Sequence, residues 1–158
     1  MTGQVRLRAV EDNDLDVLFD HQADPKAAGM AAFPSRNRGQ FDTHWARIRR
    51  DDAVILRTVV VGGAVAGCVS SWPDDDDGRR LVGYWIGRDH WGRGVATRAL
   101  EQFLAEVADR PLHAHVATHN TGSIRVLEKC GFRRDHALEA EAPEPEDGVA
   151  EFILVLLR

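Results

Sequence analysis

The chain has 158 residues, of which 44% are hydrophobic and 28% are charged, and its formal net charge is −5. This composition is typical of a soluble globular protein, and the acidic balance argues against a dedicated nucleic-acid binder. No apolar run is long enough to cross a bilayer, and the N-terminal residues lack the apolar centre of a secretion signal.

The N-terminal part predicts one strand and two helices. Alternating apolar residues favour a strand over residues 4–10, and helical spacing after an acidic first turn favours a helix over residues 11–21. Residues 24–38 contain Gly and Pro and are predicted to be irregular. Residues 40–50 have apolar side chains three to four apart, which indicates a short amphipathic helix.

The middle of the chain predicts a hairpin, a third strand and a strong helix. Residues 54–61 and 65–72 are β-rich runs separated by two glycines, which is a hairpin turn signal. Residues 80–87 are predicted to form the next strand. Residues 95–107 carry apolar side chains on one helical face.

The C-terminal part predicts a strand over residues 112–118 and a helix over residues 121–130. Two last strands, residues 132–141 and 150–157, are expected on either side of a loop rich in proline and acidic residues. The predicted order is therefore β-α-α-β-β-β-α-β-α-β-β, which describes one mixed α/β domain over residues 1–158.

The two cysteines, Cys68 and Cys130, have no CxxC spacing and are predicted to be buried thiols, which favours a reducing compartment. We therefore expect a cytoplasmic protein with neither nucleic acid nor a membrane among its partners. Both a monomer and a homodimer are compatible with the sequence.

The turn around Arg93 is predicted to bind phosphate. Gly92 and Gly94 bracket it where a strand passes into a helix, so the backbone can turn sharply and approach a ligand. The first N–H groups of a helix have no intrahelical partner, and the helix dipole favours an anion there. The segment is neither a dinucleotide fingerprint nor a P-loop, and an ordinary tight turn remains the alternative.

A second segment gives this turn a family context. WGRGVA, residues 91–96, resembles the pyrophosphate-binding loop of the GNAT superfamily of acyl-CoA-dependent N-acetyltransferases, and NTGSIRVLEKCGF, residues 120–132, resembles the next conserved segment of that superfamily. The two segments have the right order and separation. The residues of the two segments are most similar to those of the branch that includes ribosomal-protein-alanine N-acetyltransferases.

The resemblance implies a fold and a cofactor. The fold is a mostly antiparallel twisted sheet of about seven strands, splayed between the fourth and fifth and flanked by about four helices. Acetyl-CoA is the implied cosubstrate, with pantetheine in the opening and the diphosphate on the glycine turn. The residues implied to bind it are Trp85, Ile86, Gly87, Trp91, Gly92, Arg93, Gly94, Val95, Ala96, Thr97, Asn120 and Lys129.

The catalytic residues depart from the family pattern. Many relatives place a tyrosine, the general acid, four residues after the serine or alanine of the second segment, where this chain has Leu127. Ser123 is the candidate substitute, because a hydroxyl in the first turn of this helix could bond the leaving sulfur. Tyr84 is a candidate for the acceptor site, and His115 for a base role.

Alternative roles stay open for several of these residues. Asn120 and Ser123 could serve only as hydrogen-bonding groups at a helix start, and Arg125 is expected on a solvated helix face. His113 and His115 share one face of a strand, but no carboxylate or cysteine stands at ligand spacing, so we expect no metal.

The sequence therefore predicts an acyltransferase that moves the acetyl group of acetyl-CoA to a primary amine, on a small molecule or a protein N-terminus, by direct attack. Two alternatives remain: a catalytically degenerate CoA-binding sensor, which Leu127 favours, and an interaction module that uses the apolar C-terminal strand. The acceptor pocket is expected to come mainly from residues 24–45.

Overall fold

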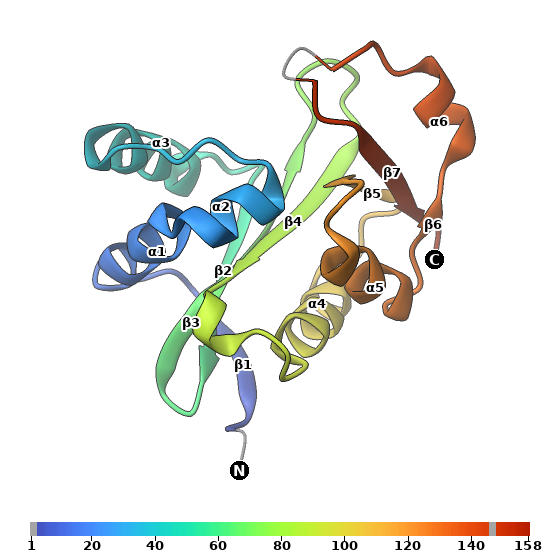
Figure 1. The fold of residues 1–158 in the computed structure, drawn as a ribbon. Coiled ribbons are helices and arrows are strands. Elements are labelled where there is room, and N and C mark those ends of the chain that lie inside the picture. The colour runs from blue at the N-terminus through green and yellow to red at the C-terminus, as the bar shows by residue number, and fades with distance from the viewer. Residues whose placement is uncertain (1–2, 146–147) are drawn as a thin grey trace.

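The computed structural model describes residues 3–145 and 148–158, which form a seven-stranded sheet (Figure 1). Its spatial order is β1-β2-β3-β4-β5-β7-β6, and every neighbouring pair is antiparallel except β4 and β5. The strands are β1 (Val5–Arg8), β2 (Ile55–Val61), β3 (Ala64–Pro73), β4 (Arg80–Ile86), β5 (Leu112–Ala117), β6 (Arg133–Arg134) and β7 (Glu151–Leu156). The predicted mixed α/β class is confirmed.

The two parallel strands meet at one point and then separate. Leu81 and His113 form the single pair between β4 and β5. Beyond that pair the strands diverge toward their C-terminal ends, whereas the whole length of β4 is paired with β3. The predicted opening between the fourth and fifth strands is therefore present, and it exposes one backbone edge of β4.

Six α-helices flank the sheet, where about four were expected. Helices α1, α2 and α3 lie on one side of it and α4 and α5 on the other (Figure 1). The helices are α1 (Asp14–Ala23), α2 (Pro25–Ala31), α3 (Arg38–Arg50), α4 (Val95–Glu106), α5 (Thr121–Lys129) and α6 (His136–Glu141).

The two extra helices correct the sequence prediction. Residues 24–38 are not irregular throughout, because Asp24 accepts a hydrogen bond from the Lys26 amide and proline occupies the first position of α2. Residues 132–141 are not one long strand. β6 has two residues, and Asp135 then caps α6 by accepting from the Leu138 amide.

Apolar side chains form two clusters, one on each side of the sheet. The larger cluster joins the sheet to α4 and includes Leu100 and Phe103, which are fully buried. The smaller one joins α1 and α3 through Leu18, Phe41 and Trp45. Burial on both faces fixes the sheet between two helical layers.

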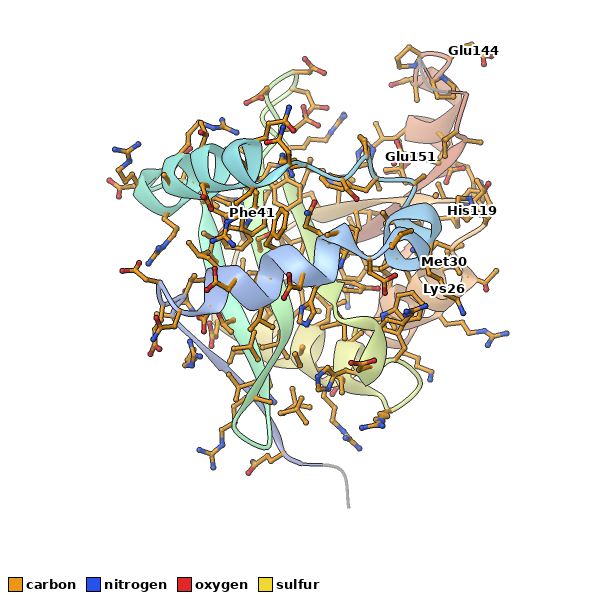
Figure 2. The ribbon with its side chains drawn as sticks, turned by 60° about the vertical axis from the view of Figure 1, so that its left-hand side comes forward. Lys26, Met30, Phe41, His119, Glu144 and Glu151 are labelled. Atoms are coloured by element: carbon orange, nitrogen blue, oxygen red, sulfur yellow. The ribbon has the colours of Figure 1, made fainter. Side chains whose placement is uncertain are left out.

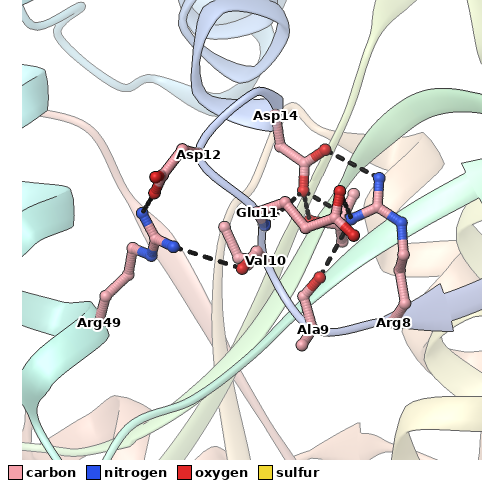
Figure 3. A network of polar contacts seen from close by, with 8 residues as sticks. Arg8, Ala9, Val10, Glu11, Asp12, Asp14 and Arg49 are labelled. Carbon is pink, nitrogen blue, oxygen red and sulfur yellow. Dashed lines mark hydrogen bonds and ion pairs between the residues drawn. The ribbon is translucent and has the colours of Figure 1, made fainter.

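A buried carboxylate ties the first strand to the first helix and to β2 (Figure 3). Asp14 accepts two bonds from the Arg8 guanidinium, at 2.7 and 2.8 Å, and further bonds from the Glu11 amide and the Thr58 hydroxyl, both at 2.8 Å. The Arg8 guanidinium, as the largest cause, lowers the pKa of Asp14 to about 2. A buried charge is tolerated here because its oxygens are bonded.

Within residues 3–145 and 148–158, no helix is long and apolar enough to cross a membrane. The predicted proline- and acid-rich loop follows α6, and residues 146 and 147 of that loop lie outside the described residues.

Candidate functional site

The turn that follows β4 leaves a row of backbone donors free. A short 3₁₀ turn, Arg88–His90, leads into Gly92 and Gly94, whose φ angles are 74° and 75°. Such positive angles favour glycine. Helix α4 starts directly after Gly94, without a side-chain cap. None of the N–H groups of residues 92–97 has a hydrogen-bond partner among the described residues, so this turn can bind an anion.

Helix α5 begins beside this turn and presents polar groups. Asn120 caps the helix, because its side-chain oxygen accepts from the Ser123 amide at 3.3 Å. The capping role predicted as the alternative for Asn120 is therefore present. Arg125 and Lys129 project from the same helix, and neither forms an ion pair with a described residue. Their charges favour an anion at this place, although the chain as a whole is acidic.

One cavity of about 490 Å³ connects these elements. Most of the residues predicted to bind the cofactor line it, and Ser123 and Tyr84 do so too. Gly87, Arg93 and His115 are not among its lining residues. The predicted residues that line it are Tyr84, Trp85, Ile86, Trp91, Gly92, Gly94, Val95, Ala96, Thr97, Asn120, Ser123 and Lys129.

Residues that point to opposite faces of β4 line the cavity. Successive side chains of a strand point to opposite faces. Tyr84 packs toward the α4 side, whereas Trp85 contacts Phe33 on the α2 side, yet both line the same cavity. A ligand entering from one face can therefore meet a second ligand entering from the other.

The free edge of β4 offers main-chain groups to this opening. The Gly87 amide donates to Ala66 of β3, so alternation along β4 turns the backbone of Ile86 and Tyr84 the other way, toward β5. The indole of Trp91 donates to the Ile86 carbonyl at 2.8 Å. The backbone groups of Trp85 and Gly87 bond to β3. Of the three β4 residues predicted to bind the cofactor, Trp85, Ile86 and Gly87, only Ile86 therefore points its main-chain groups toward the opening.

Tyr84 and Ser123 meet across the cavity. Their hydroxyl oxygens are 2.6 Å apart, and Tyr84 also lies 3.4 Å from the Ser123 carbonyl. Burial, the largest cause, raises the pKa of the Tyr84 phenol to about 12, so it stays a proton donor at neutral pH. Leu127 is 2% exposed and packs in the larger apolar cluster.

The histidines occupy other places. His115 is 40% exposed on β5, with its Nδ1 atom 4.0 Å from Glu151 Oε1. His113 is buried, and burial lowers its pKa. His119 contacts the Gly29 carbonyl at 3.1 Å, and Figure 2 shows it beside Met30 of α2. Among the described residues, no three histidine, cysteine or acidic side chains are grouped so that they could hold a metal ion.

Sequence reasoning placed the acceptor pocket mainly in residues 24–45 but missed that part of this range forms helix α2, which borders the cavity. Ala27, Met30 and Ala31 line it, because α2 lies over the end of the opening. The Asp-Pro pair that starts α2 is a helix-start signal and could have found this helix. Arg125 also lines the cavity while remaining exposed, so its predicted solvated face borders the site. The other lining residues not predicted are His90, Thr121, Gly122 and Val126.

The chain is similar to known acetyltransferases. A family model described as an acetyltransferase (GNAT) domain matches residues 4–133. The uncharacterized N-acetyltransferase p20 of Bacillus licheniformis is 26% identical over 151 residues, which cover 87% of this chain and 83% of p20.

Solved acetyltransferases share the fold. The spermidine N-acetyltransferase of Vibrio cholerae, in complex with CoA and spermine, superposes with a TM-score of 0.78 at 17% identity, covering 98% of this chain and 95% of that one. The aminoglycoside acetyltransferase AAC(6')-Ib, in complex with coenzyme A, gives a TM-score of 0.78 at 16% identity with the same coverage of both chains.

Proposed function

The chain belongs to the GNAT acetyltransferase family, and on this basis we propose that it transfers the acetyl group of acetyl-CoA to a primary amine in a ternary complex. One observation carries the proposal: a single cavity joins the free amides of the glycine turn to both faces of β4. The amine acceptors named for the Vibrio cholerae enzyme and for AAC(6')-Ib support an amine here. The ribosomal-protein-alanine branch and a cytoplasmic location remain predictions.

The diphosphate of CoA is proposed to bind the N–H groups of residues 92–97, with Lys129 and Arg125 adding positive charge at the rim. The pantetheine arm then follows the opening along β4. Ile86 is proposed to hydrogen-bond it through the main chain, and the indole of Trp91 must share or release the Ile86 carbonyl.

The thioester carbonyl is proposed to lie against the free edge of β4. During attack its oxygen gains negative charge, and a backbone N–H of Ile86 or Tyr84 aimed into the opening stabilises that charge. The amine nitrogen forms a bond to the carbonyl carbon, and the bond from that carbon to sulfur breaks. An ammonium nitrogen loses one proton before attack and a second one after it, and the sulfur gains one.

The two hydroxyl groups are proposed to supply the proton to sulfur. Ser123 lies in the first turn of α5, and its hydroxyl is bonded to Tyr84 at 2.6 Å, so a proton given to the leaving sulfur can be replaced through the pair. This pair stands in for the tyrosine that many relatives carry at the position of Leu127. His115 lies on the same sheet face as Trp85 but does not line the cavity, so it is proposed to accept the proton of the ammonium group through a water molecule.

Turnover and binding measured on matched variants test the proposal. Release of the CoA thiol from acetyl-CoA is followed with a panel of primary amines, and the acetylated product is identified by mass. Ser123→Ala and Tyr84→Phe are each expected to lower kcat about a hundredfold while the Kd for acetyl-CoA stays within about twofold. Thr43→Ala, which removes an exposed hydroxyl on α3, is expected to change neither.

Binding of acetyl-CoA without turnover of any amine would instead favour the sensor alternative. Full activity of both hydroxyl variants would remove the pair from the mechanism while leaving the transferase in place.

A further inference from the structure

The segment between α2 and α3 is held in place by a buried amide. Gln22 of α1 is 6% exposed, and its side chain bonds both backbone groups of Arg36: its oxygen accepts from the Arg36 amide at 3.0 Å, and its nitrogen donates to the Arg36 carbonyl at 3.2 Å. Ser35 adds a bond from its hydroxyl to the Gln22 carbonyl at 2.9 Å. A buried polar side chain thus fixes the position of Arg36.

The side chain of Arg36 has no anionic partner among residues 3–145 and 148–158. Its guanidinium lies 5.0 Å from the centre of the Phe33 ring. The charged neighbours are basic: burial and the nearby Arg47 lower the pKa of Arg36, and burial, Arg36 and Arg47 lower the pKa of His44. A partly buried cation among like charges is unfavourable until an anion joins it.

Two aromatic rings lie between this cation and the cavity, whose lining includes Trp85 but neither Phe33 nor Arg36. The rings of Phe33 and Trp85 meet edge to face, with centroids 5.5 Å apart, and Trp85 lines the cavity on its α2 side. The indole N–H of Trp85 is buried and has no hydrogen-bond partner among the described residues. Two donors that lack acceptors, Arg36 and Trp85, therefore stand on the side from which an acceptor molecule would enter.

We infer that Arg36 binds a carboxylate on the acceptor, so that the substrate is a primary amine that also carries a carboxylate. The planar fork of a guanidinium matches a carboxylate with two parallel hydrogen bonds, and the Phe33 ring packs against the guanidinium of Arg36. The same charge disfavours polycationic acceptors. This assignment depends on the proposed transferase activity, whose site it completes.

The carboxylate has two sources, a free amino acid and the acidic first residue of a peptide. Thiol release is therefore measured with matched pairs that differ in charge: L-methionine against L-methioninamide, and an Asp-Ala-Ala amide against an Asn-Ala-Ala amide. Spermine serves as the polycation. In at least one pair, the carboxylate member is expected to have a kcat/KM about tenfold or more above that of its neutral partner.

Arg36→Gln is expected to abolish that preference through KM, lowering kcat/KM for the carboxylate member about tenfold or more and changing the neutral member by less than about twofold. Arg36→Lys, which keeps the charge without the fork, is expected to recover part of the loss. Arg50→Gln, the control, removes a cation at the end of α3 and is expected to leave kcat/KM unchanged for both members of each pair. The thermal midpoint of each variant reports whether it is folded.

A wild-type preference for spermine or for the neutral members overturns the carboxylate site while leaving the transferase intact. The same conclusion follows when Arg36→Gln affects both members of a pair equally. Tight binding of acetyl-CoA with transfer to no amine overturns the proposed transferase, and the acceptor assignment with it.

Discussion

Replacing Asp14 with asparagine is expected to destabilise the fold in a pH-dependent manner. The Arg8 guanidinium, the Glu11 amide and the Thr58 hydroxyl all bond this carboxylate, and its pKa falls from 3.8 to about 2. At 1.36 kcal/mol per unit of pKa, this difference contributes about 2 kcal/mol to the free energy of unfolding at pH 7. Asp14 is 2% exposed, so solvent screening reduces this value little.

The direction of the pH dependence of stability follows from the lowered pKa of Asp14 in the folded state. A lowered pKa stabilises the folded protein above the unfolded pKa of 3.8, and the contribution is lost as the pH falls through about 2. The gap in unfolding free energy between wild type and Asp14→Asn is expected to shrink from about 2 kcal/mol at pH 7 to about 1 kcal/mol at pH 3. Urea unfolding at both pH values measures this gap.

Asp12→Asn is the matched control, because Asp12 pairs with Arg49 at 2.8 Å but is 92% exposed (Figure 3). Its substitution is expected to cost less than about 0.5 kcal/mol at either pH. A gap for Asp14→Asn that is below about 0.5 kcal/mol at pH 7, or that does not change with pH, would refute the reasoning.

Two further substitutions probe the β4 region. Gly67→Ala would place a Cβ 2.1 Å from the Trp85 carbonyl oxygen, so we expect the free energy of unfolding to fall by about 3 kcal/mol or more. Gly29→Ala is the control, because Gly29 lies in open space on α2 and its substitution should be neutral or stabilising. Equal urea midpoints for the two variants would contradict this expectation. Leu127→Tyr restores the side chain of many relatives but enlarges a buried side chain, so it is expected to lower the free energy of unfolding by about 1–3 kcal/mol without raising kcat. A variant with a higher kcat would show that the Tyr84 and Ser123 pair is not the proton donor.

The sequence predicted the parts of the fold that depend on local pattern. The hairpin of β2 and β3 and the amphipathic helix α4 were foreseen because turn glycines and apolar periodicity specify them, whereas the opening beside β4 was implied by the resemblance to the GNAT superfamily. Helix α2 and the break after β6 were missed. Both depend on a single aspartate cap, Asp24 or Asp135, which outweighs a weak or misleading apolar pattern.

The candidate site likewise contains features that local sequence predicts and features that depend on contacts between distant residues. The glycine turn could be placed from sequence because glycine and a helix start determine where the backbone donors point. The bond between Tyr84 and Ser123 could not, because it joins side chains 39 residues apart across a tertiary contact. The two hydrogen bonds between the Gln22 side chain and the Arg36 backbone also join residues that are distant in the sequence, and no local pattern predicts such bonds for a glutamine.

The free amides of the glycine turn are central to the account, and calorimetric titration of acetyl-CoA into Gly94→Val tests them most directly. Gly63→Val is the control, since Gly63 also has a positive φ, of 83°, and open space around it, but lies in the hairpin turn between β2 and β3. We predict that the Kd for acetyl-CoA rises at least about tenfold for Gly94→Val and stays within about twofold for Gly63→Val. Equal affinities of the two variants would contradict a diphosphate held by this turn.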